Sequence, residues 1–128
     1  GAEDGEHFLS LIDLRLLDKD DFPFYNGRLH NESVFDSALI NELPVATGVT
    51  VNKVHGNSKS IDDFVVKYQA DVESMEGAAF FYACQIYNVR CLQVRSVSNY
   101  IEERDVSKWD IPLSVNNLNR FLIQLLNE

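Results

Sequence analysis

The sequence predicts an α/β fold in which short strands and helices alternate and the strands pair in parallel. Two observations predict this class. The second half of the chain reads strand, helix, strand, helix, and that order favours parallel pairing within one sheet. The composition is that of an ordinary globular protein, with 45% hydrophobic and 24% charged residues in 128. We therefore expect one domain, or one piece of a domain, with a buried core.

The first third of the chain has few regular patterns. Residues 1–6 are acidic and contain two glycines, which is typical of a loop rather than of a first strand or helix. Turns are expected at Pro23 and at the pair Asn26-Gly27, because these residue types fit turn conformations. A single short helix is expected over residues 33–43.

The middle of the chain predicts a strand, a loop and a helix. Residues 45–54 form a β-branched run that indicates the best strand of the first half. A loop is expected at 55–58, and Ser60 is expected to cap an amphipathic helix over 61–68. Residues 70–74 then form a short strand or a connector.

The last third of the chain has the clearest patterns. Residues 75–87 are apolar on nearly all sides, which is typical of a buried helix, and Asn88 is expected to end it. Residues 89–97 predict a central strand. From Ile111 onward, apolar residues recur at spacings of three and four, which predicts an amphipathic C-terminal helix.

The charge balance argues against several classes of partner. Eleven Lys and Arg against twenty Asp and Glu give a net charge of −9. Binding to nucleic acid or to an anionic membrane requires an excess of basic residues, so neither partner is expected. No apolar run approaches the ~20 residues of a membrane span. Two cysteines, Cys84 and Cys91, are expected to be buried and reduced, and we expect a soluble, cytoplasmic protein.

No metal site and no cofactor are expected. The three histidines, His7, His30 and His55, are far apart in the sequence and lack a supporting carboxylate pattern. The chain contains no glycine-rich phosphate loop and none of the HExxH, GxSxG or CxxC motifs.

Glu76 is the first candidate for a functional role. It opens the predicted apolar helix directly after Met75, and Glu73 lies nearby. One interpretation is a helix-capping acid that is stabilised by the helix dipole. The other is a carboxylate that accepts hydrogen bonds from the hydroxyls of a ligand.

The second group of candidates follows the predicted strand 89–97. Arg95, Ser98 and Asn99 place polar groups at its carboxyl end, where ligands collect in open α/β sheets. Ser98 and Asn99 either form a simple turn or bind a flat heterocycle, since an amide both donates and accepts. Trp109 is either a lid that stacks on a ring or an anchor that packs its loop against the core.

Two segments carry a resemblance to a known family. Residues 72–79, with Met75-Glu76-Gly77-Ala78, and residues 95–99, Arg-Ser-Val-Ser-Asn, resemble two motifs of the purine nucleoside phosphorylase and nucleosidase superfamily. In that superfamily the first motif contacts ribose and the second contacts the base. Residues 98–105 with Trp109-Asp110, and residues 1–6, are more similar to the futalosine hydrolase family. The resemblance extends over the whole chain.

The resemblance implies an activity and roles for particular residues. It implies a cytoplasmic nucleosidase of menaquinone biosynthesis that hydrolyses the N-glycosidic bond of futalosine and releases hypoxanthine. Glu76 would hold the 2′- and 3′-hydroxyls of the ribose, and Met75 would pack against the sugar. Asn99 takes the place of an aspartate of the adenine-specific enzymes. With Ser98 beside it, Asn99 would bind N7 and O6 of a 6-oxopurine as the catalytic contact to the leaving group.

The resemblance also implies that residues 1–128 are the C-terminal portion of one phosphorylase/hydrolase-like domain. That fold has a mixed central sheet flanked by helices, and its N-terminal strands and its water-activating carboxylate have no counterpart here. We therefore expect a chain that is inactive alone, with exposed sheet edges and a homo-oligomeric contact. Two alternatives stay open: a phosphorylase of the same fold, and a non-catalytic binding or interaction module.

Overall fold

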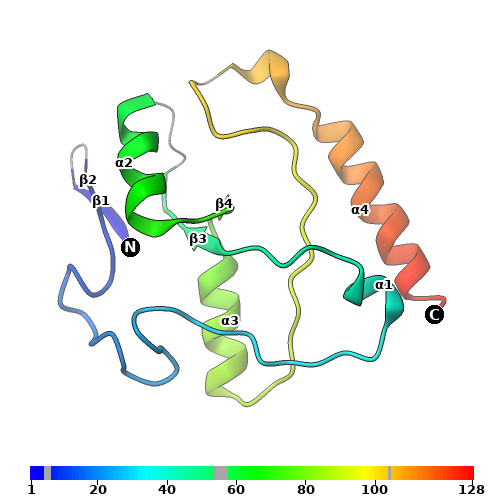
Figure 1. Cartoon of the computed structure of the whole chain (residues 1–128), viewed down its shortest axis with the longest axis horizontal. Helices are drawn as coiled ribbons and strands as arrows, with labels where there is room; N and C mark the ends of the chain where they lie inside the picture. Colours follow the sequence, from blue (N-terminus) through cyan, green and yellow to red (C-terminus); the bar gives the residue numbers. More distant parts are fainter. Residues whose placement is uncertain (5–6, 54–57, 104) are drawn as a thin grey trace.

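The computed structural model describes residues 1–4, 7–53, 58–103 and 105–128, and it confirms the α/β class (Figure 1). The loop expected at 55–58 falls largely outside these residues, and so does His55. The elements of the described residues are β1 (Ala2–Asp4), β2 (His7–Leu9), α1 (Ala38–Asn41), β3 (Gly48–Thr50), α2 (Ser58–Tyr68), β4 (Val72–Ser74), α3 (Gly77–Ile86), the 3₁₀ turn η1 (Val106–Lys108) and α4 (Ile111–Leu125).

The strands form two separate pairs. In the parallel pair β3–β4, Gly48 lies opposite Val72 and Thr50 opposite Ser74. The parallel pairing predicted for the second half of the chain, between 70–74 and 89–97, is not formed within the described residues. Helix α2 connects these two strands, as expected for a β–α–β unit. The mixed central sheet is not formed: within the described residues each sheet has two strands, so every strand is an edge strand.

The N-terminal segment is a strand, so the loop expected at residues 1–6 is wrong where it is described. β1 pairs antiparallel with β2, with Ala2 opposite Leu9. Phe8 of β2 packs edge-to-face against Phe64 and Tyr68 of α2, with ring centroids 5.3 and 5.5 Å apart. This aromatic cluster fixes the hairpin against α2 by contacts that are distant in sequence.

Segment 89–97 is extended but forms no strand within the described residues, so the predicted central strand is wrong for this structure (Figure 1). Side chains satisfy several of its backbone groups instead of a neighbouring strand. Asn31 donates to the Cys91 carbonyl at 3.0 Å, Ser33 accepts from the Cys91 amide at 3.1 Å, and Ser114 donates to the Ser96 carbonyl at 2.9 Å. A strand requires a neighbouring strand with matching backbone groups, and none of the described strands pairs with this segment.

Two of the predicted elements of the first half are shorter than expected. Only Ala38–Asn41 of segment 33–43 is helical, because Ser37 accepts from the Ile40 amide at 3.2 Å and caps the helix there. Only Gly48–Thr50 of segment 45–54 is paired as a strand. The turn at Asn26-Gly27 is confirmed, with positive φ angles of 48° and 75°.

The longer helices follow their predictions more closely. Helix α2 contains the predicted segment 61–68 but begins at Ser58, so Ser60 lies inside the helix rather than at its cap. α3 ends before Asn88, whose φ of 52° is left-handed, as expected of a residue that ends a helix. α4 begins at Ile111 as predicted, and Asp110 accepts from the Leu113 amide at 2.9 Å to cap it.

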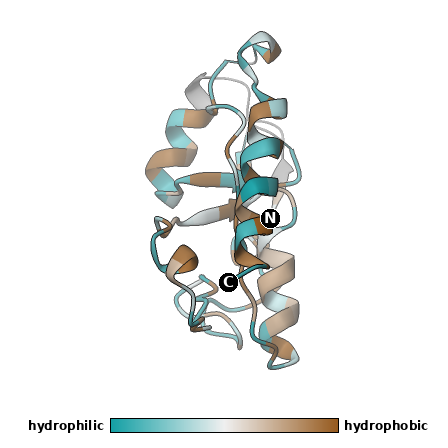
Figure 2. Cartoon of the chain, turned by 90° about the vertical axis from the view of Figure 1, so that its right-hand side faces the viewer, coloured by the Kyte–Doolittle hydropathy of each residue, from teal (hydrophilic) through white to brown (hydrophobic). Residues whose placement is uncertain are grey.

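The hydrophobic core is small. Among the described residues, the buried hydrophobic side chains are Val51, Phe64 and Cys91. The expectation of a buried α3 is wrong: Gly77 is its buried residue, while the side chains of Phe80 and Tyr82 are each 43% exposed. Figure 2 shows hydrophobic residues on the outward side of α4 as well. No layer of the described structure covers these faces, so the apolar pattern of α3 does not lead to burial.

None of the helices in the described part of the chain combines the length and the apolar character that a membrane crossing requires.

Candidate functional site

The amino-terminal end of α3 is built by the ends of the two parallel strands. Ser74 at the end of β4 accepts from the Gly77 amide at 3.2 Å, and Thr50 at the end of β3 accepts from the Ala78 amide at 2.7 Å. Two of the amides that a helix leaves unpaired at its start are thereby bonded to hydroxyls. The parallel register brings both hydroxyls to the same edge, since Thr50 lies opposite Ser74.

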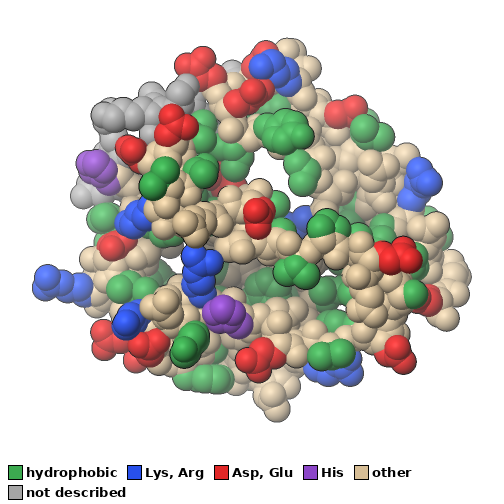
Figure 3. Space-filling view, in the orientation of Figure 1, with side chains coloured by type: hydrophobic (Ala, Val, Ile, Leu, Met, Phe, Trp, Pro, Cys, Tyr) green, Lys and Arg blue, Asp and Glu red, His purple; other side chains and the backbone are tan. Residues whose placement is uncertain are grey.

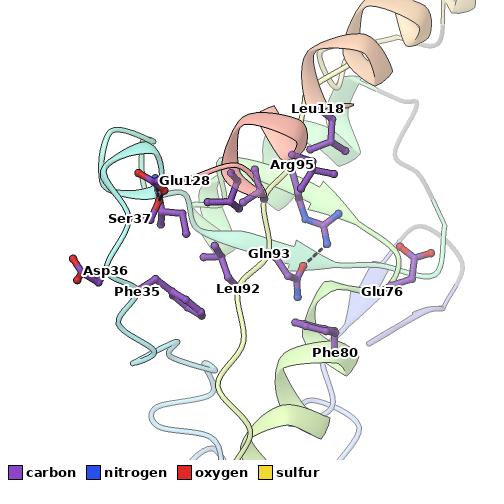
Figure 4. A pocket seen from close by; sticks show the side chains of 14 residues that line it. Phe35, Asp36, Ser37, Glu76, Phe80, Leu92, Gln93, Arg95, Leu118 and Glu128 are labelled. Atoms are coloured by element: carbon purple, nitrogen blue, oxygen red, sulfur yellow. Dashed lines mark hydrogen bonds between the residues drawn. The ribbon is translucent and has the colours of Figure 1, made fainter. Parts of the chain in front are cut away.

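Glu76 stands at the N-cap position of α3 without acting as a cap. Its side chain makes no capping hydrogen bond, because the strand hydroxyls already occupy the helix amides. The interpretation of Glu76 as a side-chain cap is therefore wrong. The carboxylate is exposed and lies on the wall of a cavity, where it is available to a ligand (Figure 4).

Gly77 allows segment 93–95 to approach the start of α3. A Cβ atom on Gly77 would lie 2.8 Å from the Ser74 hydroxyl and 3.0 Å from Nη2 of Arg95. The side-chain amide of Gln93 donates to the Gly77 carbonyl at 2.7 Å, and the Arg95 guanidinium donates to the Gln93 side-chain oxygen. This chain of contacts joins Gln93 and Arg95 to the helix end that carries Glu76.

The cavity has a volume of about 890 Å³, which lies within the range of small-molecule sites. Figure 4 shows Glu76, Gln93 and Arg95 toward one end, and Ser37 with Glu128 toward the other. Apolar side chains make up most of the wall between these ends. The lining residues are Phe35, Asp36, Ser37, Ile40, Glu76, Phe80, Leu92, Gln93, Val94, Arg95, Leu118, Leu122, Leu125 and Glu128.

Glu128 lies at the far end of the cavity. The Glu128 carboxylate accepts from the Ser37 hydroxyl and, at 3.0 Å, from the Ala38 amide at the start of α1. The hydrogen bond from Ser37 is the main reason why the pKa of Glu128 lies below its usual value. Glu128 thus links α1 to the end of α4, and both elements line the cavity.

The remaining candidates from the first motif lie beside this cavity without lining it. Met75 precedes Glu76 and its side chain is 51% exposed. Glu73 is half-buried in the middle of β4, opposite Val49.

Ser98, Asn99 and Trp109 do not line the cavity either. The Ser98 hydroxyl donates to the Asn99 side-chain oxygen at 2.7 Å, and the Asn99 amide donates to the Tyr100 carbonyl at 2.9 Å. The Asp110 amide donates to the Ser98 carbonyl at 2.9 Å, which places the half-buried Trp109 next to the same segment. These bonds are local, and the backbone at 98–100 has no regular secondary structure. The roles of Ser98, Asn99 and Trp109 in binding a base stay predictions.

Several lining residues did not emerge as site candidates from the sequence. Gln93 interrupts the apolar run 89–97 two residues before Arg95, and residues two apart share a face of an extended chain. That spacing is the signal that identifies Gln93. Phe35, Ser37 and Glu128 carry no comparable signal, because tertiary contacts from distant segments bring them to the cavity.

The two cysteines lie near each other as free thiols. Cys91 is buried as expected, whereas Cys84 is half-buried, which corrects the expectation for that residue. Burial is the main cause that raises the pKa of the Cys91 thiol, and its hydrogen bond with Cys84 adds to the effect. Within the described ranges, no three His, Cys, Asp or Glu side chains gather in a way that could hold a metal ion.

The sequence defines the class of protein. Residues 17–127 match the family model of the phosphorylase superfamily, and the chain belongs to that superfamily. It shows distant similarity to futalosine hydrolases. The futalosine hydrolase of Thermus thermophilus is 32% identical over 107 residues, which are 79% of this chain and 48% of that protein. That of Acidothermus cellulolyticus is 39% identical over 77 residues, which are 59% of this chain and 32% of that protein.

The chain therefore spans about half the length, or less, of these curated relatives. No solved structure matches the chain.

Proposed function

We propose that this chain is the sugar- and base-binding C-terminal portion of a nucleosidase that hydrolyses the N-glycosidic bond of futalosine and releases hypoxanthine. The observation that carries the proposal is the Glu76 carboxylate, which lies on a cavity of small-molecule size at the start of α3. The two relatives are futalosine hydrolases, and their similarity to this chain includes the larger part of its length.

Hydrolysis of an N-glycosidic bond requires that the substrate is positioned and that developing charge is stabilised, and it requires no cofactor. Water adds to the anomeric carbon, the bond from that carbon to the base nitrogen breaks, and the water proton ends on the departing base. A carboxylate at Glu76 that holds both ribose hydroxyls fixes the sugar while positive charge develops on it. The Thr50 and Ser74 hydroxyls bond the helix amides beside Glu76, so its backbone is rigid.

Asn99 has the leaving-group role in this proposal. An amide binds a ring nitrogen and an adjacent carbonyl together, which matches N7 and O6 of hypoxanthine. In the structure, the Asn99 amide is bonded to Ser98 and Tyr100. Binding of a base therefore requires Asn99 to exchange these local hydrogen bonds, and segment 98–100 has to approach the cavity.

Release of hypoxanthine tests the proposal. The reading frame that encodes this chain, expressed in full, is incubated with futalosine and with inosine, with and without phosphate, and free hypoxanthine is followed by chromatography. Release from futalosine without phosphate is expected. The 128-residue chain alone is expected to release none, because the family resemblance leaves the water-activating carboxylate without a counterpart in it. Absence of release from either nucleoside by the full product contradicts the proposal.

A phosphorylase is the second candidate, and Arg95 is the observation that favours it. Its guanidinium lies on the same cavity as Glu76 and offers a cation to a phosphate nucleophile. Hypoxanthine release that depends on phosphate would assign this activity instead.

A non-catalytic binding or interaction module is distinguished by the variant Glu76→Gln. A nucleoside site is expected to lose about 1.5–3 kcal/mol of inosine affinity, the contribution of a hydrogen bond to a charged group. Glu42→Gln, at the end of α1, is the matched control and is expected to bind inosine as the parent chain does. Equal affinities for inosine in all three proteins would favour the module. Cytoplasmic location and a homo-oligomeric state also stay predictions.

A further inference from the structure

Arg95 on the cavity wall is held by a neutral partner rather than by an acid. Among the described residues that line the cavity, Arg95 is the one basic side chain, against three acidic ones. None of the ion pairs in the described part of the chain includes Arg95. Its guanidinium donates instead to the side-chain oxygen of Gln93 (Figure 4). The guanidinium is therefore held in place without a carboxylate that would neutralise its charge.

Gln93 links this guanidinium to the start of α3. The half-buried side chain of Gln93 donates through its amide nitrogen to the Gly77 carbonyl at 2.7 Å, and its oxygen accepts from Arg95. A carboxylate has no donor for the Gly77 carbonyl, and an aliphatic side chain makes neither bond. A carboxamide at position 93 is therefore suited both to reach the helix and to hold the guanidinium without changing its charge.

The Arg95 guanidinium keeps most of its hydrogen-bonding capacity for a ligand. A guanidinium carries several N–H donors, and within the described residues the side chain of Arg95 makes its hydrogen bond to Gln93. Arg95 is exposed and lines the same cavity as Glu76. Figure 3 shows open hollows in the middle of the molecule, bordered in part by hydrophobic side chains, through which a ligand has access.

We propose that Gln93 is a positioning residue: it holds the Arg95 guanidinium, with its charge not neutralised, at the Glu76 end of the cavity, where Arg95 binds an oxygen of the nucleoside. A ribose hydroxyl that donates to the Glu76 carboxylate keeps lone pairs on its oxygen, and the guanidinium donates to these. The two side chains thereby satisfy the hydroxyl from both sides. The inference rests on the nucleoside site of the proposed function, but not on the hydrolysis of futalosine.

A double-mutant cycle on inosine affinity tests the role of Gln93. Inosine is titrated calorimetrically into the 128-residue chain in a buffer free of phosphate, so that no phosphate occupies the guanidinium. Arg95→Met is expected to weaken binding about tenfold or more, since a hydrogen bond from a charged group is lost. Gln93→Met removes both bonds of Gln93 and is expected to weaken binding about threefold to tenfold. The double variant is expected to match Arg95→Met within about twofold, because Gln93 acts through Arg95.

Gln93→Glu separates the holding of the guanidinium from the preservation of its charge. The carboxylate of this variant accepts strongly from Arg95 but neutralises it, so inosine binding is expected to weaken about tenfold. Gln124→Glu and Arg120→Met are the matched controls for the added negative charge and for the lost positive charge. Both positions are exposed on α4 and do not line the cavity, so both controls are expected to bind inosine as the parent chain does.

A merely structural role for Gln93 would weaken binding equally in both backgrounds, so additive losses in the cycle would overturn the proposal. Parent-like binding by Gln93→Glu, or a parent chain that does not bind inosine, would overturn it as well. Futalosine hydrolysis is measured separately, on the full product of the reading frame. Absence of hydrolysis together with a non-additive cycle would contradict the hydrolase and support the role of Gln93.

Discussion

At the scale of single residues, Gly77 determines how closely segment 93–95 approaches the start of α3. Gly77→Ala places a Cβ 2.8 Å from the Ser74 hydroxyl and 3.0 Å from Arg95, so the strand end and segment 93–95 have to move. We expect a loss of about 1–3 kcal/mol in the free energy of unfolding, measured by urea titration. Gly48→Ala is the control, because its Cβ meets Val72 at an ordinary 3.6 Å. Equal losses in the two variants would contradict this account of Gly77.

A second prediction at the scale of single residues concerns how Asp13 makes the stability of the fold depend on pH. Hydrogen bonds from the Ser10 amide and hydroxyl and from Lys67, at 3.0 Å, lower the pKa of Asp13 from 3.8 to about 2. A lowered pKa stabilises the folded state above pH 3.8, and this stabilisation is lost as the pH falls toward 2. Asp13→Asn is therefore expected to unfold at a lower temperature than the parent chain at pH 6, and the difference is expected to vanish near pH 2.

Lys67→Met separates the partners of Asp13. Because the Ser10 amide contributes most to the lowered pKa, this variant is expected to keep part of the pH dependence. Thermal unfolding followed by circular dichroism across the acid range measures all three proteins. A pH profile of Lys67→Met that matches that of Asp13→Asn would contradict the main role of Ser10.

At the scale of elements, α4 depends on its cap at Asp110. The carboxylate accepts from the Leu113 amide at 2.9 Å, and α4 carries Leu118, Leu122 and Leu125 to the cavity wall. Asp110→Ala is expected to cost about 0.5–2 kcal/mol of stability and to reduce helicity. Asp110→Asn keeps an acceptor, and its free energy of unfolding is expected to stay within a few tenths of a kcal/mol of that of the parent chain. Urea titration with far-ultraviolet circular dichroism measures both, and equal losses would contradict the capping role.

The elements of the fold also differ in how well the sequence predicts them. α4 was predictable because its apolar spacing at three and four residues is a local feature. Strand β1 was not predictable, since Phe8 holds its hairpin by packing on Phe64, which is distant in the sequence. Segment 89–97 has the composition of a central strand, but a strand also requires neighbours, and composition does not supply them.

Some residues of the candidate site were likewise predictable from the sequence, and others were not. Glu76 and Arg95 were identified from their motifs, and both lie on the cavity. Phe35 and Glu128 were not identified, because only the tertiary fold brings segments near both ends of the chain together. Glu76 was also open to a second interpretation, as a cap. The hydroxyls of Thr50 and Ser74 bond the helix amides and leave Glu76 without a capping bond, while ligand binding by Glu76 stays a prediction. The pairing of β3 with β4 that places these hydroxyls is not visible in the local sequence around Glu76.

At the scale of the whole molecule, the small core and the large surface predict an unusual unfolding transition. The slope of the unfolding free energy against urea is proportional to the surface that unfolding exposes. With 9786 Å² already exposed, unfolding of this chain uncovers about four-fifths of the surface that a compact domain of the same mass uncovers. The urea slope is therefore expected to be about 20% below that of such a domain.

The same excess surface predicts that the folded chain binds a hydrophobic dye such as ANS, because side chains including Phe80, Tyr82, Ile86 and Ile123 are 43–61% exposed. Fluorescence of the dye is measured in native buffer, and the urea slope is measured by circular dichroism under the same conditions. A steep transition without dye binding would mean that these apolar faces are covered within the chain itself. A shallow transition with dye binding means that α3 and α4 have apolar faces still free for contact with another polypeptide.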